Sequence, residues 1–341
     1  MIRLSLRENI VLDTETENRS KTRYNISLGT LCGVGAGALW GLVFLAPEVV
    51  RDFTPLQLAI GRFLAYGIIS FFVIMPRWLV LKSRLKKQDW RALFWLSLFG
   101  NTLYYILLSK AVQSGGIALT SLVIGFLPVA VTIIGSRDKG AVSLTSLSPS
   151  LLLCGAGALC IGWQALKAPE ATHQTSMGFL WAITALLSWT AYAVGNSRSL
   201  VRLSTVSVHD WNLLMGLVTG AQAACLVPIA LLSGHLDHDL MSWSCFVGVS
   251  TAVAIIASFL GNALWNKMNR LLPLTMTGQM ILFETLFALI YGFLWEGRWP
   301  RPIEVAAFTL IVCSVMTCVS AHRKHHRTFS NAAMQSSRNG V

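Results

Sequence analysis

Long apolar runs separated by short polar stretches follow one another along almost the whole chain. A helix needs about 20 apolar residues to cross the hydrocarbon core of a bilayer, and ten runs approach or reach that length. Their approximate bounds are 28–47, 56–75, 90–109, 115–135, 149–166, 177–196, 211–232, 243–265, 273–295 and 302–321. Prolines stand at the ends of several runs, where a helix loses least from a missing amide N–H. The pattern predicts an all-α membrane protein with ten transmembrane helices.

The stretch 99–140 is repeated, with substitutions, at 260–297. Each copy reads as two apolar helices joined by a short polar turn, and the Gly-Asn pair at Asn101 returns at Asn262. The offset between the copies is not constant, because Lys110 and Lys267 are 157 positions apart whereas the two asparagines are 161 apart. The copies therefore differ by four residues, which is about one helical turn.

If the ten helices divide into two halves of five, the second half must enter the membrane from the opposite side. The spacing of Gly and Trp supports this division, since Gly29 precedes Trp40 by eleven residues and Gly178 precedes Trp189 by eleven. The sequence predicts two inverted five-helix repeats, a transporter architecture. The predicted parts are an N-terminal tail (1–27), the first repeat (28–167), the second repeat (177–321) and a basic tail (322–341).

Lysine and arginine fall mostly on one side of this topology. Of the 27 basic residues, 21 lie in the segments that share a side with the N-terminus, and five lie on the other side. Basic loops stay in the cytoplasm, so both termini are predicted to be cytoplasmic in a multi-pass protein of the inner (plasma) membrane.

Composition removes several classes of protein. Apolar residues make up 54% of the chain and charged residues 12%, about half the charged share of a soluble domain. The net charge is +12, but the basic residues are spread over the loops of one side and do not cluster on one polar segment. We therefore expect no nucleic-acid partner. The seven cysteines show no metal-ligand spacing, and no Ser/His/Asp set, Walker loop or HExxH motif is present. We therefore expect no metal, no cofactor and no enzyme.

Two charged residues lie inside the predicted helices. Glu284 lies near the middle of the ninth run, where a charge costs at least about 2.5–3.5 kcal/mol, so it should face a cavity or a partner. It would bind a proton or a substrate ammonium group, or else make a structural hydrogen bond. Arg62, in the second run, would clamp a carboxylate or phosphate, or else snorkel to the interface or pair with a loop carboxylate. If both face one cavity they would suit a zwitterion, although they could equally form one structural ion pair.

Polar and aromatic residues add further candidates. Asn262 and its repeat mate would bond across helices or, second, line a pore. Trp40, Trp189 and Tyr104 lie well inside helices and would line a cavity or pack in the core. Gln279 is a weaker pore candidate. Glycines recur every fourth residue in the first run, which predicts a smooth face for close helix contact; they are Gly29, Gly33, Gly37 and Gly41.

These residues together resemble the EamA branch of the drug/metabolite transporter superfamily, over roughly 29–320. The matching elements are Ala36-Leu39-Trp40-Gly41, Thr54-Pro55 followed by Arg62-Phe63, Leu127-Pro128-Val129, and Glu296-Gly297 before the last apolar run. The resemblance implies a secondary transporter, commonly an exporter of amino acids and related metabolites. It implies a central cavity lined by helices 1–4 and 6–9, with helices 5 and 10 peripheral. Applied to this sequence, the resemblance implies six cavity residues: Trp40, Arg62, Tyr104, Trp189, Asn262 and Glu284.

One element departs from that pattern. Where the second half should repeat the Leu-Pro-Val element, the chain reads Phe283-Glu284-Thr285, without the proline that would bend the ninth helix. Glu284 is thus particular to this chain.

The functional expectation is an inner-membrane exporter of amino acids or related small metabolites that works by alternating access, with protons coupled through Glu284. The alternatives are an uptake carrier of the same architecture and a non-transporting membrane scaffold or receptor. The expected partners are a small-molecule substrate, protons and the lipid bilayer, with association into a homodimer left open.

Overall fold

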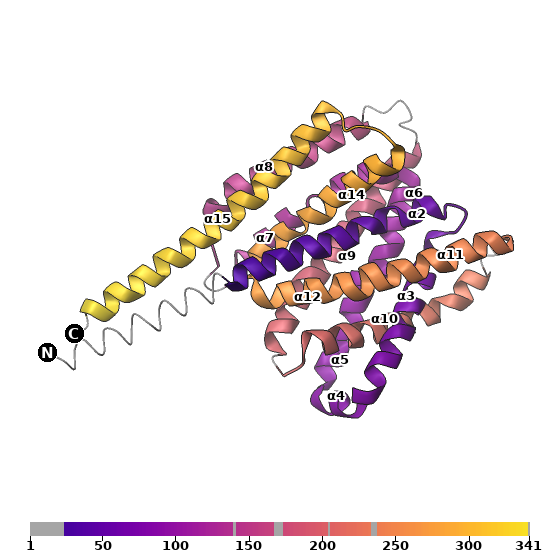
Figure 1. Ribbon diagram of the computed structural model, residues 1–341, viewed down its shortest axis with the longest axis horizontal. Helices are drawn as coiled ribbons and strands as arrows, with labels where there is room; N and C mark the ends of the chain where they lie inside the picture. Colours follow the sequence, from indigo (N-terminus) through magenta and orange to yellow (C-terminus); the bar gives the residue numbers. More distant parts are fainter. Residues whose placement is uncertain (1–23, 139–140, 167–172, 204, 233–236, 340–341) are drawn as a thin grey trace.

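The computed structural model describes residues 24–138, 141–166, 173–203, 205–232 and 237–339, and its regular structure over these residues is helical without strands. Most of the predicted N-terminal tail and the turn between the predicted repeats at 167–172 lie outside these residues. The helices form one bundle, from which the last helix extends at the end where the first helix begins (Figure 1).

Eight of the described helices are long and apolar enough to cross a membrane. They are Tyr24–Val49, Pro55–Arg84, Lys87–Ile117, Met177–Arg202, Val208–Leu232, Leu240–Leu271, Leu274–Trp295 and Pro302–His325. A shorter apolar helix, Leu144–Gly157, belongs to α8 (Leu144–Leu166) and is the fifth predicted run. The fourth run is divided between the end of α6 (Leu103–Ile124) and α7 (Leu127–Gly135). All ten predicted runs are therefore helical, which confirms the fold class.

The remaining elements subdivide these spans. The second span joins α3 (Pro55–Ile74), η2 (Met75–Arg77) and α4 (Trp78–Arg84). The third begins with α5 (Lys87–Ser97) and continues through η3 (Leu98–Thr102) into α6. In the second half, α9 (His173–Arg202) and α10 (Val208–Leu232) are followed by α11 (Leu240–Val253), η4 (Ala254–Gly261), α12 (Asn262–Leu271), α13 (Leu274–Met280), α14 (Leu282–Glu296) and α15 (Pro302–Asn339).

Three helix boundaries differ from the predicted ones. The fourth helix is interrupted just before Leu127, because Pro128 fits the first turn of a new helix better than the interior of an old one. The ninth helix is interrupted at Ile281 although it has no proline; the amide of Glu284 bonds there to the carbonyl of Ile281, which tightens one turn. The tenth helix does not end near 321 but continues to Asn339 as part of α15.

The turn between the third and fourth spans depends on one glycine. Gly116 has φ of +79° and ψ of 167°, a backbone conformation essentially reserved for glycine. This residue lets the chain reverse inside what is otherwise continuous helical hydrogen bonding.

We expect Gly116→Ala to lower the free energy of unfolding by about 1–3 kcal/mol, the range for forcing a side chain into such a region. A Cβ at Gly116 would meet no atom within 4 Å, so the effect would come from the backbone alone. Gly155→Ala in α8 is the matched control, since its Cβ also has open space but its backbone is helical. Thermal unfolding in detergent should separate the two variants, and equal stability would contradict this reading of the turn.

The two halves meet as a pseudo-twofold structure would require. We number the spans by the ten predicted runs. The second span packs against the seventh (α3 with α10), the fourth against the ninth (α7 with α13) and the fifth against the tenth (α8 with α15). Each of these pairs joins a helix to its own repeat mate, and Figure 1 shows α8 and α15 side by side along one flank of the bundle. At the α3–α10 crossing, a Cβ on Gly67 would lie 2.6 Å from the Cα of Gly220, so only glycines permit this approach.

Both Gly-Asn pairs of the repeat lie at distorted turns. The elements η3 and η4 are π-helical, and a π turn widens the helix and frees carbonyl groups. Side chains from the other half bond to those carbonyls: Ser188 Oγ donates to Phe99 O at 2.7 Å, and Trp40 Nε1 donates to Ala257 O at 3.0 Å. The repeated sequence thus encodes a repeated irregularity next to the contact between the halves.

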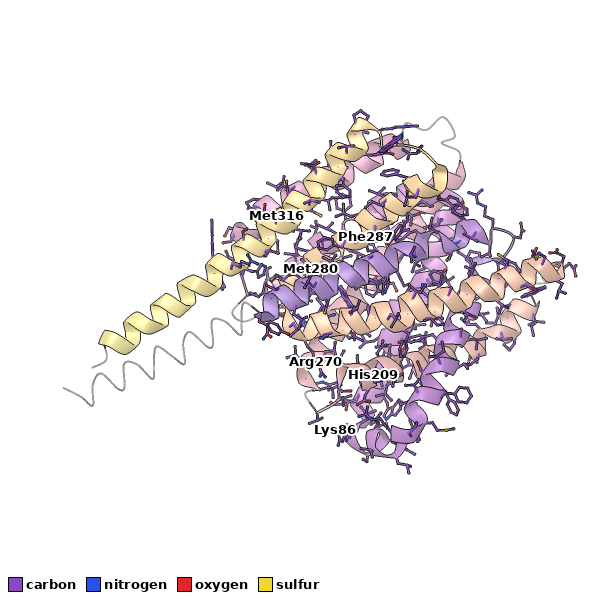
Figure 2. The ribbon with its side chains drawn as sticks, in the orientation of Figure 1. Lys86, His209, Arg270, Met280, Phe287 and Met316 are labelled. Carbon is purple, nitrogen blue, oxygen red and sulfur yellow. The ribbon has the colours of Figure 1, made fainter. Side chains whose placement is uncertain are left out.

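The glycine face of the first span makes a close helix contact, as the spacing predicted, and the structure shows that its partner is the ninth span. A Cβ on Gly37 would lie 2.8 Å from the backbone N of Glu284, and one on Gly41 would lie 2.9 Å from the N of Ala288. Met280 and Phe287 border the same contact and are labelled beside the first span in Figure 2. The stripe therefore brings the backbone that carries Glu284 directly against the first helix.

Candidate substrate-binding site

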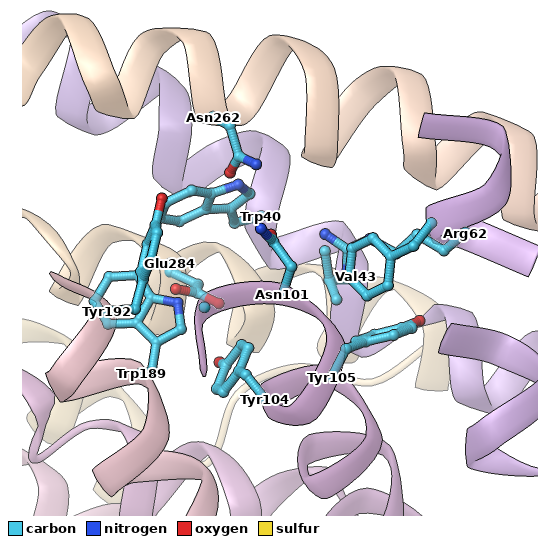
Figure 3. Close-up of a pocket in the computed structure, with 12 residues that line it drawn as sticks. Trp40, Val43, Arg62, Asn101, Tyr104, Tyr105, Trp189, Tyr192, Asn262 and Glu284 are labelled. Atoms are coloured by element: carbon cyan, nitrogen blue, oxygen red, sulfur yellow. The ribbon is translucent and has the colours of Figure 1, made fainter. Parts of the chain in front are cut away.

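A cavity between the two halves collects residues from six spans. Its lining comprises Trp40, Val43, Arg62, Phe63, Gly100, Asn101, Tyr104, Tyr105, Trp189, Tyr192, Asn262 and Glu284. All six residues predicted from the sequence lie in this lining (Figure 3). The cavity volume is about 20 Å³, which is room for about one water molecule. The conformation is therefore contracted around its polar groups.

Trp40 and Trp189 form the aromatic side of the cavity, and Trp265 packs against both of them. Ring centroids are 5.8 Å apart for Trp40 and Trp189, and each lies 5.1 Å from Trp265. Such separations are typical of favourable aromatic pairs. Tyr104 adjoins the cluster, with its ring 6.3 Å from that of Trp189. Because the three tryptophans come from the first, sixth and eighth spans, the cluster joins the two halves at the cavity.

Glu284 is buried at the beginning of α14, with 5% of its surface exposed. Its Oε2 has no hydrogen-bond partner among the residues that the structure describes. Buried polar atoms nearly always have such a partner, so an unpartnered carboxylate oxygen at a cavity indicates a ligand or proton site. The hydroxyl of Tyr104 is buried without a described partner as well.

Arg62 lies at the other side of the cavity from Glu284, and in Figure 3 the side chain of Asn101 lies between them. Within the described residues no ion pair joins the two charges. The Nε of Arg62 instead donates to Ser258 Oγ at 2.8 Å, and its guanidinium carbon lies 4.5 Å from the ring centre of Tyr105. Of the two readings open from the sequence, the geometry supports two separate charges that face one cavity.

The repeated asparagines occupy equivalent positions in the lining. Asn101 Nδ2 also donates to Thr219 Oγ1 of α10 at 3.3 Å, so this residue combines the bonding and lining roles that the sequence left open. Asn262 lies on the opposite side, in the first turn of α12.

Sequence reasoning missed several contributors. Tyr105, Tyr192 and Val43 line the cavity, and Ser258 holds Arg62 in place. The only sequence signal for Tyr105 was its position beside Tyr104, and a serine in an apolar run gives no signal. Gln279 is elsewhere: its Nε2 donates to Thr132 Oγ1 at 3.3 Å and its Oε1 accepts from Ser150 and Ser314 at 3.2 Å, in a buried network beneath the peripheral helices.

Comparison with known proteins agrees with this architecture. Residues 27–138 and 176–320 match the EamA-like transporter family. The chain is 28% identical over 316 residues to the inner membrane protein YtfF of Escherichia coli, with 86% of this chain and 95% of that protein covered. It is 26% identical over 242 residues to an uncharacterised transporter of Synechocystis, with 69% of this chain and 65% of that protein covered.

A solved crystal structure has the same fold. It superposes with a TM-score of 0.65 over 87% of this chain and 98% of its own, at 20% identity, which speaks to the fold alone. The family match covers well over half of the sequence and both predicted repeats. The chain therefore belongs to the EamA-like transporter family of the drug/metabolite transporter superfamily, and is a multi-pass membrane transporter.

Proposed function

We propose that this transporter moves small zwitterionic metabolites of the amino-acid class through the central cavity. The observation that carries the proposal is the pair of opposite charges that face one cavity without bonding to each other, Arg62 and Glu284. A guanidinium presents a planar set of donors to a carboxylate, and a carboxylate at the opposite side receives an ammonium group. Trp40 and Trp189 supply aromatic faces that attract a cation.

The contracted cavity requires movement. A volume of about 20 Å³ is far below the several hundred Å³ of an ordinary ligand site. Substrate entry thus needs the halves to separate around the cavity, first at one face and then at the other, which is alternating access about the repeat interface. The domain division at residues 167–177 belongs to the same proposal, because each half would move as one body.

We place both termini in the cytoplasm, on the side of the basic loops, and propose export as the physiological direction. Glu284 would couple export to protons, because a carboxylate that binds either a proton or a substrate ammonium group cannot bind both. The same architecture also serves an uptake carrier. Accumulation of labelled substrate in inside-out and right-side-out vesicles distinguishes the two directions, and accumulation only in right-side-out vesicles would reverse the proposed one.

Binding of a zwitterion is expected to raise the apparent melting temperature of the purified protein. The gain follows RT ln(1 + [L]/Kd), about 2.7 kcal/mol at a ligand concentration 100 times Kd. Each amino acid is compared with the amine that lacks its carboxylate and with the acid that lacks its ammonium group. The proposal predicts stabilisation by the zwitterion alone and its loss in Arg62→Gln. Equal shifts for all three compounds would contradict zwitterion recognition, and the absence of both shift and flux across the whole class would favour a non-transporting scaffold.

A further inference from the structure

The two halves are tied together by ion pairs at one end of the bundle. We call it the basic end, since it carries Lys86 at the start of α5 and Arg270 in the last turn of α12, which lie with His209 at the same end of the bundle in Figure 2. Arg77, where the second span turns into α4, lies 2.8 Å from Asp210 of α10. Arg202, at the end of α9, lies 2.8 Å from Asp89 at the start of α5. Each pair joins a residue of the first half to a residue of the second.

The aspartates of these pairs are buried and the arginines are not. The side chains of Asp210 and Asp89 are 3% and 2% exposed, whereas those of Arg77 and Arg202 are 56% and 43% exposed. Asp89 is fully engaged, because its second oxygen also accepts the amide of Lys86 at 2.9 Å. Asp210 Oδ1 accepts no hydrogen bond from the residues that the structure describes, so its contact with Arg77 is electrostatic. A buried carboxylate depends on its cation or on water, which ties each aspartate to its arginine while the halves are together.

The opposite end is closed differently. Phe53, in the turn between the first and second spans, is 2% exposed and stacks on Phe246 of α11 with ring centroids 4.3 Å apart. Trp243 and His238 complete this cluster at 5.0 and 4.2 Å. Two ion pairs lie at this end, Arg51–Glu48 and Arg298–Glu304, and each joins residues of the same half. Ring contacts join the halves here, among them Phe53 with Phe246 and the Lys110 ammonium 4.7 Å from the ring centre of Trp181.

The two closures occupy repeat-related places. Asp89 and Arg202 join the start of the third span to the end of the sixth. In the repeat, the third span corresponds to the eighth and the sixth to the first. The equivalent junction is therefore between the start of the eighth span and the end of the first, where the Phe53 cluster lies. One contact has thus become ionic in one copy and aromatic in the other. Between them lies the contracted cavity, whose opening requires one closure or the other to separate.

We propose that the pairs Arg77–Asp210 and Arg202–Asp89 form the gate at the basic end, and that the Phe53 cluster forms the gate at the opposite end. Separation of the halves at the basic end would bring water to both aspartates, while the half-exposed arginines are already hydrated. These residues contribute to transport without lining the cavity. The inference rests on the two-ended closure and holds whatever the substrate is.

A cysteine reporter in the cavity tests the gate. Val43→Cys is made in a chain whose exposed cysteines Cys225, Cys245 and Cys313 are replaced by serine, and a membrane-impermeant maleimide is applied to vesicles of known sidedness. Labelling of the same chain without the reporter measures the background from the four remaining cysteines, Cys32, Cys154, Cys160 and Cys318. Removing a pair, as in Asp89→Asn/Arg202→Gln, should raise the rate of labelling from the basic face about tenfold. The rate rises in proportion to the fraction of molecules that are open at this end. Phe53→Ala should raise labelling from the other face only.

Two comparisons make the result specific to the pairs. The charge exchange Arg77→Asp/Asp210→Arg should return labelling toward the parent rate, and it leaves the helix cap made by Asp89 intact. The exposed pair Arg198–Asp138 also joins the halves at the basic end, with side chains 56% and 43% exposed, and its removal should change labelling less than about twofold because exposed pairs contribute little.

Three outcomes would overturn the proposal. Unchanged labelling in both Asp89→Asn/Arg202→Gln and Arg77→Gln/Asp210→Asn, with both proteins monodisperse in detergent, would show that the pairs do not hold a gate. Equal increases from both faces would indicate a loosened fold. Failure of the charge exchange to recover either folding or low labelling would show that the contact is not an ion pair in function.

Discussion

A transporter carrying Glu284→Gln is expected to lose flux driven by a pH gradient and to retain exchange of substrate against substrate. Glutamine keeps the size and a hydrogen-bonding end of the side chain but cannot take up or release a proton. In the structure the Glu284 carboxylate is buried at the cavity, and its Oε2, which has no described partner, is available to take up and release a proton. Reconstituted vesicles measure both quantities: uptake after a pH jump, and counterflow at equal pH.

Glu48→Gln is the matched control for that experiment. Glu48 is also a carboxylate, but it lies at the far end of the first span and pairs with Arg51 outside the cavity. This variant should keep both activities. Full gradient-driven flux in Glu284→Gln would reject coupling through this carboxylate while leaving the transport assignment intact, whereas loss of both activities would make Glu284 a substrate ligand without a separate role in coupling.

Gly37→Leu is expected to be the most damaging single substitution on the first span. Its Cβ alone would lie 2.6 Å from the Cβ of Phe283 and 2.8 Å from the backbone N of Glu284. Overpacking of one or a few methyl groups costs about 1–3 kcal/mol, and a backbone neighbour cannot move aside as a side-chain end can. The first and ninth spans would separate and take Glu284 away from the cavity. We therefore expect a melting temperature in detergent many degrees lower and no ligand-induced shift.

Gly248→Leu supplies the comparison for Gly37. Gly248 also lies in a transmembrane helix, α11, but a Cβ there would meet no atom within 4 Å. The added side chain is the same, so hydrophobicity and helix propensity are matched and only packing differs. Comparable melting temperatures for the two variants would contradict the close contact between the first and ninth spans.

Much of this architecture could be predicted from the sequence because two of its signals are long. The ten apolar runs are set by bilayer thickness, and the repeat is visible as matched residues such as Asn101 and Asn262. Burial of a charge in hydrocarbon is so unfavourable that Arg62 and Glu284 had to face a cavity or a partner. The structure places both in one lining, together with the other four candidates.

The remaining features depend on contacts that a linear pattern does not contain. Ser258 positions Arg62 only because a π turn in η4 presents it there, and no composition rule distinguishes it from other serines in apolar runs. The break at Ile281 arises from a locally tightened hydrogen bond and not from proline. Gln279 looked like a pore residue because it is polar, but side chains from α7, α8 and α15 already satisfy it. Pairwise geometry decides these cases.

The unlike contacts at the two ends of the bundle make the protein sensitive to its medium. Dissolved ions weaken the attraction of the half-exposed Arg77 for Asp210, whereas salts that are excluded from protein surfaces strengthen apolar contacts such as that of Phe53 with Phe246. Under the alternating access proposed above, the inward-facing and outward-facing forms would therefore differ in free energy, even though the chain is built from two related halves. Osmotic and ionic conditions inside the cell would bias which face the empty carrier presents.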